Sequence, residues 1–316
     1  MGRYLIGRLI SAIPVRLGVL VVVFVFLRLI PGDPVQVFYF GSDAGGQSNT
    51  AVSDEVIEQA RRAYNLDKSI PEQFVLYVVD VLRGELGRSF RTRQPIVDII
   101  REQMPATLEL TFAGMGVALL IGLVAGTLSA VKHHTVVDYA SQYFAVLGVS
   151  IPSFWLGILL IYLFSVNLGW LPAISTGNGP KQLLMPAISL GVGASAIIAR
   201  LMRSSMLDVM RHDFVRTARA KGVTESGVVW GHALKNAMIP VLTIVGLQFG
   251  ALLAGSVVIE VVFTRQGLGF TLVKSISNRD YPVVQALVML SAFIYVGVNI
   301  VVDVLYTYID PRVRLS

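Results

Sequence analysis

Five long stretches of the chain contain no Asp, Glu, Lys or Arg, and they are rich in apolar residues. They cover residues 110–131, 139–180, 182–199, 236–259 and 281–302. A helix that crosses a bilayer needs about 20 apolar residues, and inside lipid only helices and closed barrels satisfy their own backbone groups. Only 15% of the residues are charged, whereas a soluble domain carries about a quarter. The pattern predicts an all-α polytopic membrane protein.

Six membrane-spanning helices are predicted from these stretches and from a less clean apolar segment near the N-terminus. Arg16 and Arg28 lie near the ends of that first segment, where long side chains can reach the membrane surface. Its apolar part is too long for a signal peptide, so it is expected to remain as a span. Pro152 is expected to bend the third span, and Pro240 to mark the entry to the fifth. The predicted spans are residues 9–30, 107–131, 143–166, 183–203, 238–260 and 281–307.

Lys and Arg are distributed unequally between the connections. The two termini and the connections on their side hold 12 basic residues, while the short loops on the other side hold 4. Because Lys and Arg favour the cytoplasmic side, the termini (1–8 and 308–316) and the connection 204–237 are predicted to be cytoplasmic. Residues 31–106 are predicted to form a small external helical cap, and residues 261–280 an external loop.

Two helices are predicted within this cap. The first begins at Ser53, with acidic residues in its first turn and apolar residues on one face. The second has Pro71 in its first turn and stops at Gly84. The cap is therefore expected to be a folded helical segment rather than a simple loop.

The longest cytoplasmic connection combines basic residues with helical spacing. A first short helix is predicted up to Gly222, and a second from Thr224, which would act as its N-cap. Val228, Val229 and Trp230 would form an apolar knob on the second helix. Such a surface suits the docking of a partner protein, and it equally suits a helix that lies on anionic lipid heads. The residue pattern leaves both interpretations open.

Polar residues are scarce in the predicted spans, and no Asp or Glu lies near the middle of one. A carrier driven by protons or sodium usually needs such carboxylates, so their absence argues against secondary transport. Gln248 lies mid-span and either lines a path or forms a helix–helix hydrogen bond. The candidate path residues are Ser150, Ser153, Gln248, Ser256 and Asn299.

Small residues repeat at four-residue spacing in two of the spans, which permits close packing of helices. The pairs are Gly122 with Gly126, and Gly246 with Gly250. Each pair is expected to pack against another helix of this subunit or of a partner.

Charged residues flank the last external loop. They are Glu260, Arg265, Arg279 and Asp280. The loop either meets an external protein, gates the outer mouth of a path, or forms a structural turn.

Several chemistries are excluded by what the sequence lacks. The chain has no cysteine, so disulfides, thiolate metal sites and Cys nucleophiles are excluded. His133 and His134 are adjacent, but no further ligand lies at metal-site spacing, so no metal site is predicted and both are expected to be solvated loop residues. The sequence contains no G-x-x-x-x-G-K-[ST] phosphate-binding loop. No catalytic residue is predicted, and a membrane-embedded enzyme ranks low.

The stretch "RTARAKG", followed by "WGHALKNAMIP", resembles the cytoplasmic loop of bacterial ABC-importer permeases. Their general pattern is Glu-Ala-Ala, three residues, Gly, nine residues, then Ile-x-Leu-Pro. Aligned on Gly222, this chain has Arg216, Thr217 and Ala218 in place of Glu-Ala-Ala, and no Pro at the expected position. That departure resembles the dipeptide, oligopeptide and nickel family, in its first-permease (B-type) branch. Further matches are "LIPGDP", "GELGRSF", "SIPSFWLGILLIYLFS", "RDYPVVQA" and "VVDVLYTYIDPRVR".

This resemblance implies a type I ABC-importer permease fold in the bacterial inner membrane. It implies a second, related permease that completes a heterodimeric path, and two cytoplasmic ATPases that bind ATP and Mg. It also implies an external solute-binding protein that delivers the solute. The chain itself is expected to be non-catalytic and to bind no cofactor. The resemblance does not identify the solute. The candidates are dipeptides, oligopeptides, glutathione-like thiols, peptide antibiotics and nickel chelates.

Coupling to the ATPases is expected to run through residues 213–231. The expected coupling residues are Phe214, Arg216, Thr217, Ala218, Arg219, Ala220, Lys221, Gly222, Val229 and Trp230. The alternative is a self-sufficient carrier or channel that needs no ATPase partner.

Overall fold

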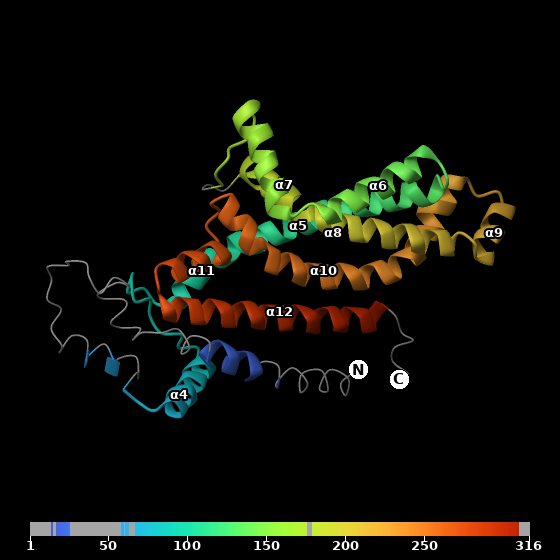
Figure 1. Ribbon diagram of the computed structural model, residues 1–316. Helices are drawn as coiled ribbons and strands as arrows, with labels where there is room; N and C mark the ends of the chain where they lie inside the picture. Colours follow the sequence, from blue (N-terminus) through green and yellow to red (C-terminus); the bar gives the residue numbers. More distant parts are fainter. Residues whose placement is uncertain are drawn as a thin grey trace. The chain divides into compact units, whose positions relative to one another are not determined.

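The computed structural model describes the backbone of residues 14, 17–25, 58–59, 61–62, 67–175 and 179–309, and side chains as far as residue 302. Throughout these ranges the regular structure is helical, apart from one isolated bridge between Arg88 and Pro95 (Figure 1). The predicted all-α fold class is therefore confirmed. The termini 1–8 and 310–316, and the helix predicted from Ser53, lie wholly or largely outside the described residues.

The helices follow one another along the chain with short connections. They are α4 (Ile70–Arg83), α5 (Ile96–Val131), α6 (Val136–Ser150), α7 (Ser153–Leu160), the π-helix η1 (Ile161–Asn167), α8 (Pro180–Val209), α9 (Asp213–Ala220), the π-helix η2 (Gly227–Ala233), α10 (Leu234–Val262), α11 (Leu268–Ser277) and α12 (Tyr281–Ile309). The chain divides into two compact units. The larger unit contains Pro105–Phe270 and residues from Gly297 onward, and the smaller contains the described residues up to Met104 with Thr271–Val296.

Four helical segments of the described chain are long and apolar enough to cross a membrane. They are Ile96–Val131, Pro180–Val209, Gly227–Val262 and Tyr281–Val302. A fifth candidate is the pair Val136–Ser150 and Ser153–Asn167, whose two halves meet at an angle of 102°. The first predicted span, 9–30, falls mainly outside the described residues. Within it the structure describes residues 14 and 17–25, which are helical.

The bend between α6 and α7 lies where the sequence predicts it, at Pro152. Ile151, the residue before the proline, is extended, with φ −84° and ψ 119°. A proline disfavours the helical conformation of the residue before it, so α6 ends there. Pro240 behaves differently, because it lies inside α10 and the helix runs without a break from Gly227 to Val262. A helix can continue on both sides of the membrane surface, so the prediction that Pro240 marks the entry to the fifth span stays a prediction.

Two helices extend well beyond the spans predicted for them. α5 begins at Ile96, before the predicted boundary at 107, and α8 continues to Val209, past the predicted boundary at 203. The predicted boundaries follow the positions of charged residues. A backbone hydrogen-bond ladder continues through charged residues once a helix has left the lipid, so charge marks the membrane surface rather than the helix end.

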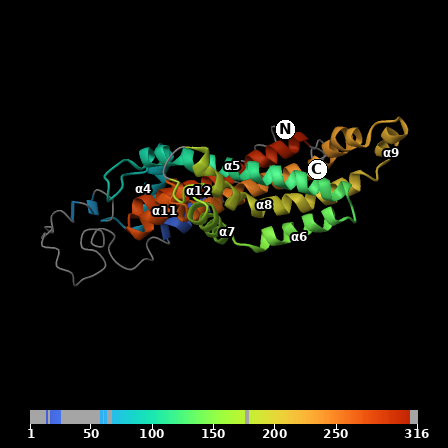
Figure 2. The same ribbon diagram turned by 90° about the horizontal axis from the view of Figure 1, so that it is seen from above.

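Helix α8 forms the centre of the larger unit. In its most apolar window 61% of the residues are buried, compared with 33% for α5 and 22% for α10. The core around it includes Ile198, Met202 and Met206 of α8 with Leu110 and Val241 of its neighbours. Figure 2 shows α5, α6 and α8 running side by side.

Close contact between α5 and α8 depends on glycines of the predicted packing pair. A Cβ atom added at Gly122 would lie 2.8 Å from the Cβ of Ile198, and one added at Gly126 would lie 2.5 Å from the backbone oxygen of Ala199. Real Cβ atoms do not approach so closely, so only glycine permits this separation of the two backbones.

In the smaller unit, α4 has the ends that its sequence predicts. The carboxylate of Glu72 accepts hydrogen bonds from the backbone N–H of Ser69 (3.1 Å) and from its hydroxyl (2.9 Å), and Pro71 lies in the first turn. These bonds lower the pKa of Glu72. Gly84 ends the helix with φ +79°, in the left-handed region that glycine adopts without strain. The predicted stop at Gly84 is confirmed.

Replacing Gly126 by Ala is expected to destabilise the subunit by about 1–3 kcal/mol, because the added methyl group forces α5 and α8 apart. Thermal unfolding of the purified transporter would measure this. Gly116→Ala in the same helix is the matched control, since nothing lies within 4 Å of its added Cβ, and Ala favours the helix over Gly. An equal loss of stability in both variants would contradict close packing at Gly126.

Candidate functional site

Residues 213–231, which are predicted to couple to the ATPases and are named the coupling segment here, begin shortly beyond the end of α8. After a short turn, α9 runs from Asp213 to Ala220, with an acidic residue in its first turn. Gly222 follows directly after the end of the helix. Its φ is +79°, and its N–H donates to the carbonyl oxygen of Arg219 (2.9 Å). The N–H of Val223 donates to the carbonyl oxygen of Ala218 (3.2 Å). This is a left-handed helix end, so the predicted stop at Gly222 is confirmed.

The inner side of α9 packs on the helix that follows it. Val215, Ala218 and Val228 form a buried cluster, and Met210 packs against it. Val229, the next residue along, belongs to the main core of the larger unit. The coupling segment is therefore a folded hairpin with its own small core. Ala218 lies in this small core, and Val229 lies in the main core of the larger unit.

The predicted apolar knob of Val228, Val229 and Trp230 is wrong in two of its three members. Both valines are buried, and only Trp230 projects, with 52% of its surface exposed. The reason is tertiary: residues 227–233 form η2, which continues into α10 and turns both valines toward packed neighbours. Such contacts between segments cannot be read from helical spacing.

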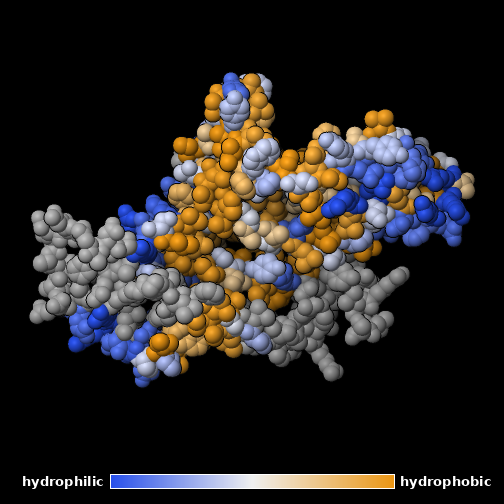
Figure 3. Space-filling model, viewed as in Figure 1, coloured by the Kyte–Doolittle hydropathy of each residue, from blue (hydrophilic) through white to orange (hydrophobic). Residues whose placement is uncertain are grey.

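The outer side of the segment is polar, with two exposed aromatic residues. Figure 3 shows hydrophilic residues gathered at the end of the unit where α9 lies, and an apolar surface over α6 and α7. The other exposed coupling residues found there are Phe214, Arg216, Thr217, Arg219, Ala220, Lys221 and Gly222. Nη1 of Arg216 lies 3.6 Å from Oδ1 of Asp213, and both side chains are largely exposed.

Arg219 is engaged within the segment. Its Nε and Nη2 donate to the carboxylate of Glu225 at 3.0 and 2.6 Å. These hydrogen bonds hold the pKa of Glu225 below its ordinary value and raise the pKa of Arg219. Because the pKa of Glu225 is lowered on folding, the contribution of the pair to stability is present above the ordinary carboxyl pKa and is lost only as the pH falls below it. At neutral pH the pair closes the hairpin, although both groups are exposed and salt screens them.

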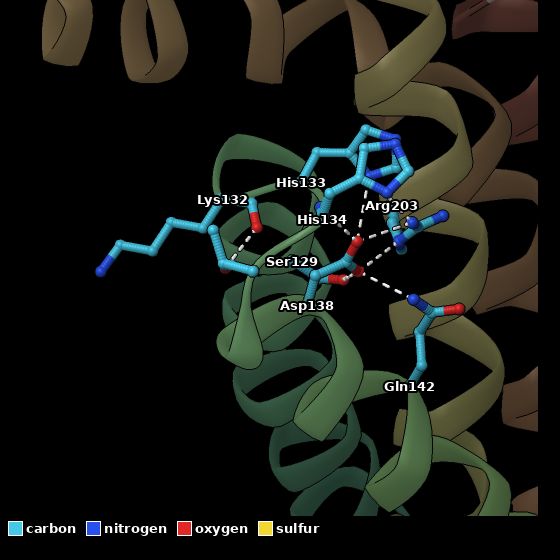
Figure 4. Close-up of polar contacts among 8 residues, drawn as sticks. Ser129, Lys132, His133, His134, Asp138, Gln142 and Arg203 are labelled. Carbon is cyan, nitrogen blue, oxygen red and sulfur yellow. Dashed lines mark hydrogen bonds and ion pairs between the residues drawn. The ribbon is translucent and has the colours of Figure 1, made fainter.

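A second polar site, which sequence reasoning missed, lies where α5 and α6 meet α8. The carboxylate of Asp138 is 1% exposed, and Arg203 of α8 donates to both of its oxygens, from Nε at 2.8 Å and from Nη2 at 2.9 Å (Figure 4). The same carboxylate accepts hydrogen bonds from the Ser129 hydroxyl (2.6 Å), the backbone N–H of His134 (3.1 Å) and the Gln142 amide (2.9 Å).

His133 completes this cluster, so its predicted role as a merely solvated residue is wrong. Its Nδ1 lies 3.0 Å from Oδ2 of Asp138 and 3.1 Å from Nη2 of Arg203. The available sequence signal was that Asp138 immediately precedes the longest charge-free stretch and that Arg203 ends a predicted span. Neither position indicates from the sequence alone that the two residues meet. Among the described residues no group of His, Asp and Glu side chains is arranged to hold a metal ion.

The candidate path residues are not brought together by hydrogen bonds. The hydroxyls of Ser150 and Ser256 donate to carbonyl oxygens of their own helices, Val146 (2.9 Å) and Leu253 (2.8 Å). Ser256 is fully buried within this chain. The others, Ser153, Gln248 and Asn299, are partly exposed.

The second glycine pair lies on α10. A Cβ added at Gly246 would come within 2.4 Å of Val302 on α12, and Gly250 is buried. The pair therefore faces packed protein within the subunit, like Gly122 and Gly126.

The charged residues of the loop predicted to be external, residues 261–280 with its flanks, divide between the two units. In the larger unit, the buried carboxylate of Glu260 accepts a hydrogen bond from the Thr107 hydroxyl (2.6 Å) and one from the N–H of Phe270 (3.0 Å). Thr107 in turn accepts from the N–H of Leu268 (2.8 Å). A Cβ added at Gly267 would lie 2.6 Å from the Glu260 carboxylate. Here the loop is a structural turn built around a buried acid.

Arg265 and Asp280 are also engaged. Arg265 pairs with Glu109 and is itself buried. In the smaller unit, Asp280 accepts hydrogen bonds from the Ser89 hydroxyl (2.5 Å) and the N–H of Phe90 (3.0 Å). Arg279, next to it, has a positive φ of 56°.

The arrangement of the helices defines the class of protein to which this chain belongs. It has the fold of a permease subunit of an ABC importer. A solved inward-facing MetNI methionine ABC transporter matches 69% of this chain and 99% of its own, with a TM-score of 0.58 and 20% identity. An amino acid ABC transporter solved with histidines matches 67% of this chain and 94% of its own, with a TM-score of 0.54 and 17% identity.

The chain belongs to the family of binding-protein-dependent transport system inner membrane components, whose model matches residues 104–315. The model of the family's N-terminal membrane component matches residues 1–111. The glutathione transport system permease protein GsiC of Escherichia coli strain K12 is 43% identical over 99% of both chains. GsiC of Pectobacterium atrosepticum is also 43% identical over 99% of both chains. The family predicted from the sequence is confirmed, and with it a non-catalytic permease whose importer hydrolyses ATP in separate subunits.

Replacing Thr107 by Val is expected to destabilise the subunit by about 1–3 kcal/mol, because Glu260 and the N–H of Leu268 each lose a partner in a buried turn. Thermal unfolding of the purified transporter would measure the loss. Thr127→Val is the matched control: Thr127 lies in the same helix, and its buried hydroxyl has no hydrogen-bond partner in the described structure. If both variants lose the same amount of stability, the hydrogen bonds of Thr107 do not stabilise the turn.

Proposed function

We propose that this chain forms, with a second related permease, a path for short peptides of the glutathione type across the bacterial inner membrane. Both termini lie in the cytoplasm, and an external binding protein delivers the solute. The coupling segment docks on a cytoplasmic ATPase. The observation that carries the proposal is an exposed, internally packed helical hairpin at the end of α8, in a chain whose sequence has no phosphate-binding loop.

The shape of the coupling segment supports docking on protein over lying on lipid. An interfacial helix presents a continuous apolar face to the membrane. In α9 the apolar residues Val215 and Ala218 are already buried against Val228. What remains exposed is a polar surface with three large apolar residues, Phe214, Val223 and Trp230. Single aromatic anchors within a polar surround are typical of protein interfaces.

The proposed orientation follows from the basic residues. Most of the Lys and Arg in the short connections lie on the side of the coupling segment and the termini. The same orientation places Asp138 and Arg203 at the cytoplasmic ends of their helices and the Glu260 turn at the external ends. Such positions suit charged and hydrogen-bonding groups, which are costly at the centre of a bilayer.

The proposed solute rests on the relatives. Relatives that are 43% identical over 99% of their length carry the name of a glutathione transport system. The sequence has no mid-span Asp or Glu to couple transport to protons or sodium, so the alternative of a self-sufficient carrier has no titratable group to use.

Trp230→Ala tests the docking role. Trp230 is exposed, so its removal is expected to leave the subunit folded, yet binding of the ATPase should weaken by about 30-fold or more if Trp230 is an interface anchor. Retention of the ATPase during purification and ATP-dependent uptake would both be measured. Val223→Ala, an exposed apolar residue on the same hairpin, is the control. Unchanged ATPase binding with Trp230→Ala would favour the lipid-surface interpretation.

Uptake by the reconstituted importer tests the solute. With the binding protein outside and ATP inside, we expect proteoliposomes to accumulate labelled glutathione, and unlabelled glutathione to compete. A nickel–histidine chelate or a simple dipeptide in excess should compete poorly. Accumulation of the dipeptide without glutathione would reassign the solute, and uptake without ATP would favour a self-sufficient carrier.

A further inference from the structure

We propose that the Asp138–Arg203 pair is the rigid joint through which the coupling segment moves the third span, so that both are positioning residues for transport. The proposal rests on the docking role proposed above. It assigns to the two residues a task that neither docking nor solute binding performs: holding the start of α6 to α8 while the ATPases pull on α9.

The connections of the chain explain why such a joint is needed. The coupling segment is joined covalently to α8 before it and to α10 after it. α8 and α10 are also tied to each other, since the Ser205 hydroxyl donates to the carbonyl oxygen of Ala237 (2.9 Å). A force on α9 therefore moves the inner ends of these two helices together. α6 is separated from the segment along the chain by α7, η1 and α8, and it packs against α8.

The geometry at Asp138 is that of a fixed joint rather than a surface ion pair. Arg203 binds both carboxylate oxygens, so the planar guanidinium and the carboxylate resist rotation as well as separation. Ser129 of α5 and Gln142 of α6 hold the carboxylate from two further directions. The carboxylate is buried, so water and salt screen the pair far less than an exposed one. Three helices thus meet at one carboxylate (Figure 4).

The far end of α6 shows where the movement goes. α6 has 15 residues, which corresponds to a rod of about 22 Å. One end carries Asp138, and the other ends at the Pro152 bend, where the chain turns by 102°. Ser150 and Ser153, two of the candidate path residues, flank that bend. Gly148, near this end of α6, also lies against Val192 and Ala196 of α8. With its start fixed at Asp138, α6 therefore delivers a displacement of α8 to the bend.

Asp138→Asn tests the joint in the complete reconstituted importer, with labelled glutathione as the probe. The variant keeps the shape of the side chain but loses its charge, and leaves Arg203 without a counter-ion. We expect the ATPases to remain bound and ATP hydrolysis to stay within about twofold of the parent, while glutathione transported per ATP falls about tenfold, a usual size for coupling between sites. Asp208→Asn on α8 is the matched control, because that carboxylate is exposed and makes no side-chain hydrogen bond or ion pair in the described structure.

A second variant keeps the proposal testable if Asp138→Asn fails to fold. The chain has no cysteine, so Asp138→Cys with Arg203→Cys introduces the only thiols of this subunit. Transport per ATP should be low before cross-linking and should recover when a short bifunctional maleimide bridges the two sites. Normal transport before cross-linking, or no recovery after complete cross-linking, would overturn the joint. Loss of the ATPases from the parent importer would instead count against the proposed function.

Discussion

Close backbone contact along α8 is the constraint on which the larger unit depends. Apolar side chains gain little when they leave lipid for protein, so membrane helices are held by van der Waals contact and hydrogen bonds. Gly122 and Gly126 bring α5 against α8, and Gly191 of α8 approaches Gly114 of α5 so closely that an added Cβ would lie 2.3 Å from its carbonyl oxygen. Because α8 is held in this way, its end is a stable base for the coupling segment.

Polar contacts between helices gather at the two ends of this unit, not at its middle. Some buried hydroxyls within the helices donate to their own backbone, as Ser189 does to the carbonyl oxygen of Met185 (2.8 Å) and Ser256 to that of Leu253 (2.8 Å). The ties that cross from helix to helix include Thr107 with Glu260 at one end, and Asp138 with Arg203 and Ser205 with Ala237 at the other. Charged groups are least costly near the membrane surfaces, so the ends can be fixed by directional bonds while the middle is held by shape alone.

Local patterns in the sequence predicted the features that depend on local chemistry. Charge-free stretches predicted the apolar helices, and the stops at Gly84 and Gly222 followed from the left-handed conformation that glycine permits. Features that depend on distant contacts were not predictable in this way. Arg203 meets Asp138 across 65 residues, and Val228 is buried because α9 folds over it. Pro240 lies inside α10, as a proline can in a long membrane helix when neighbouring groups compensate for its missing N–H.

The order of residues in η2 shows how a force on the surface can reach the core. Trp230 is exposed, while Val229 beside it lies in the core of the larger unit and Val228 lies in the core of the hairpin. A π-helix turns successive side chains differently from an α-helix, and such segments are frequent at functional sites. Because η2 continues directly into α10, no loop lies between Trp230, the proposed docking residue, and that helix. In the proposed coupling, a movement of Trp230 would be a movement of α10, which Ser205 ties to α8 and Arg203 in turn ties to α6.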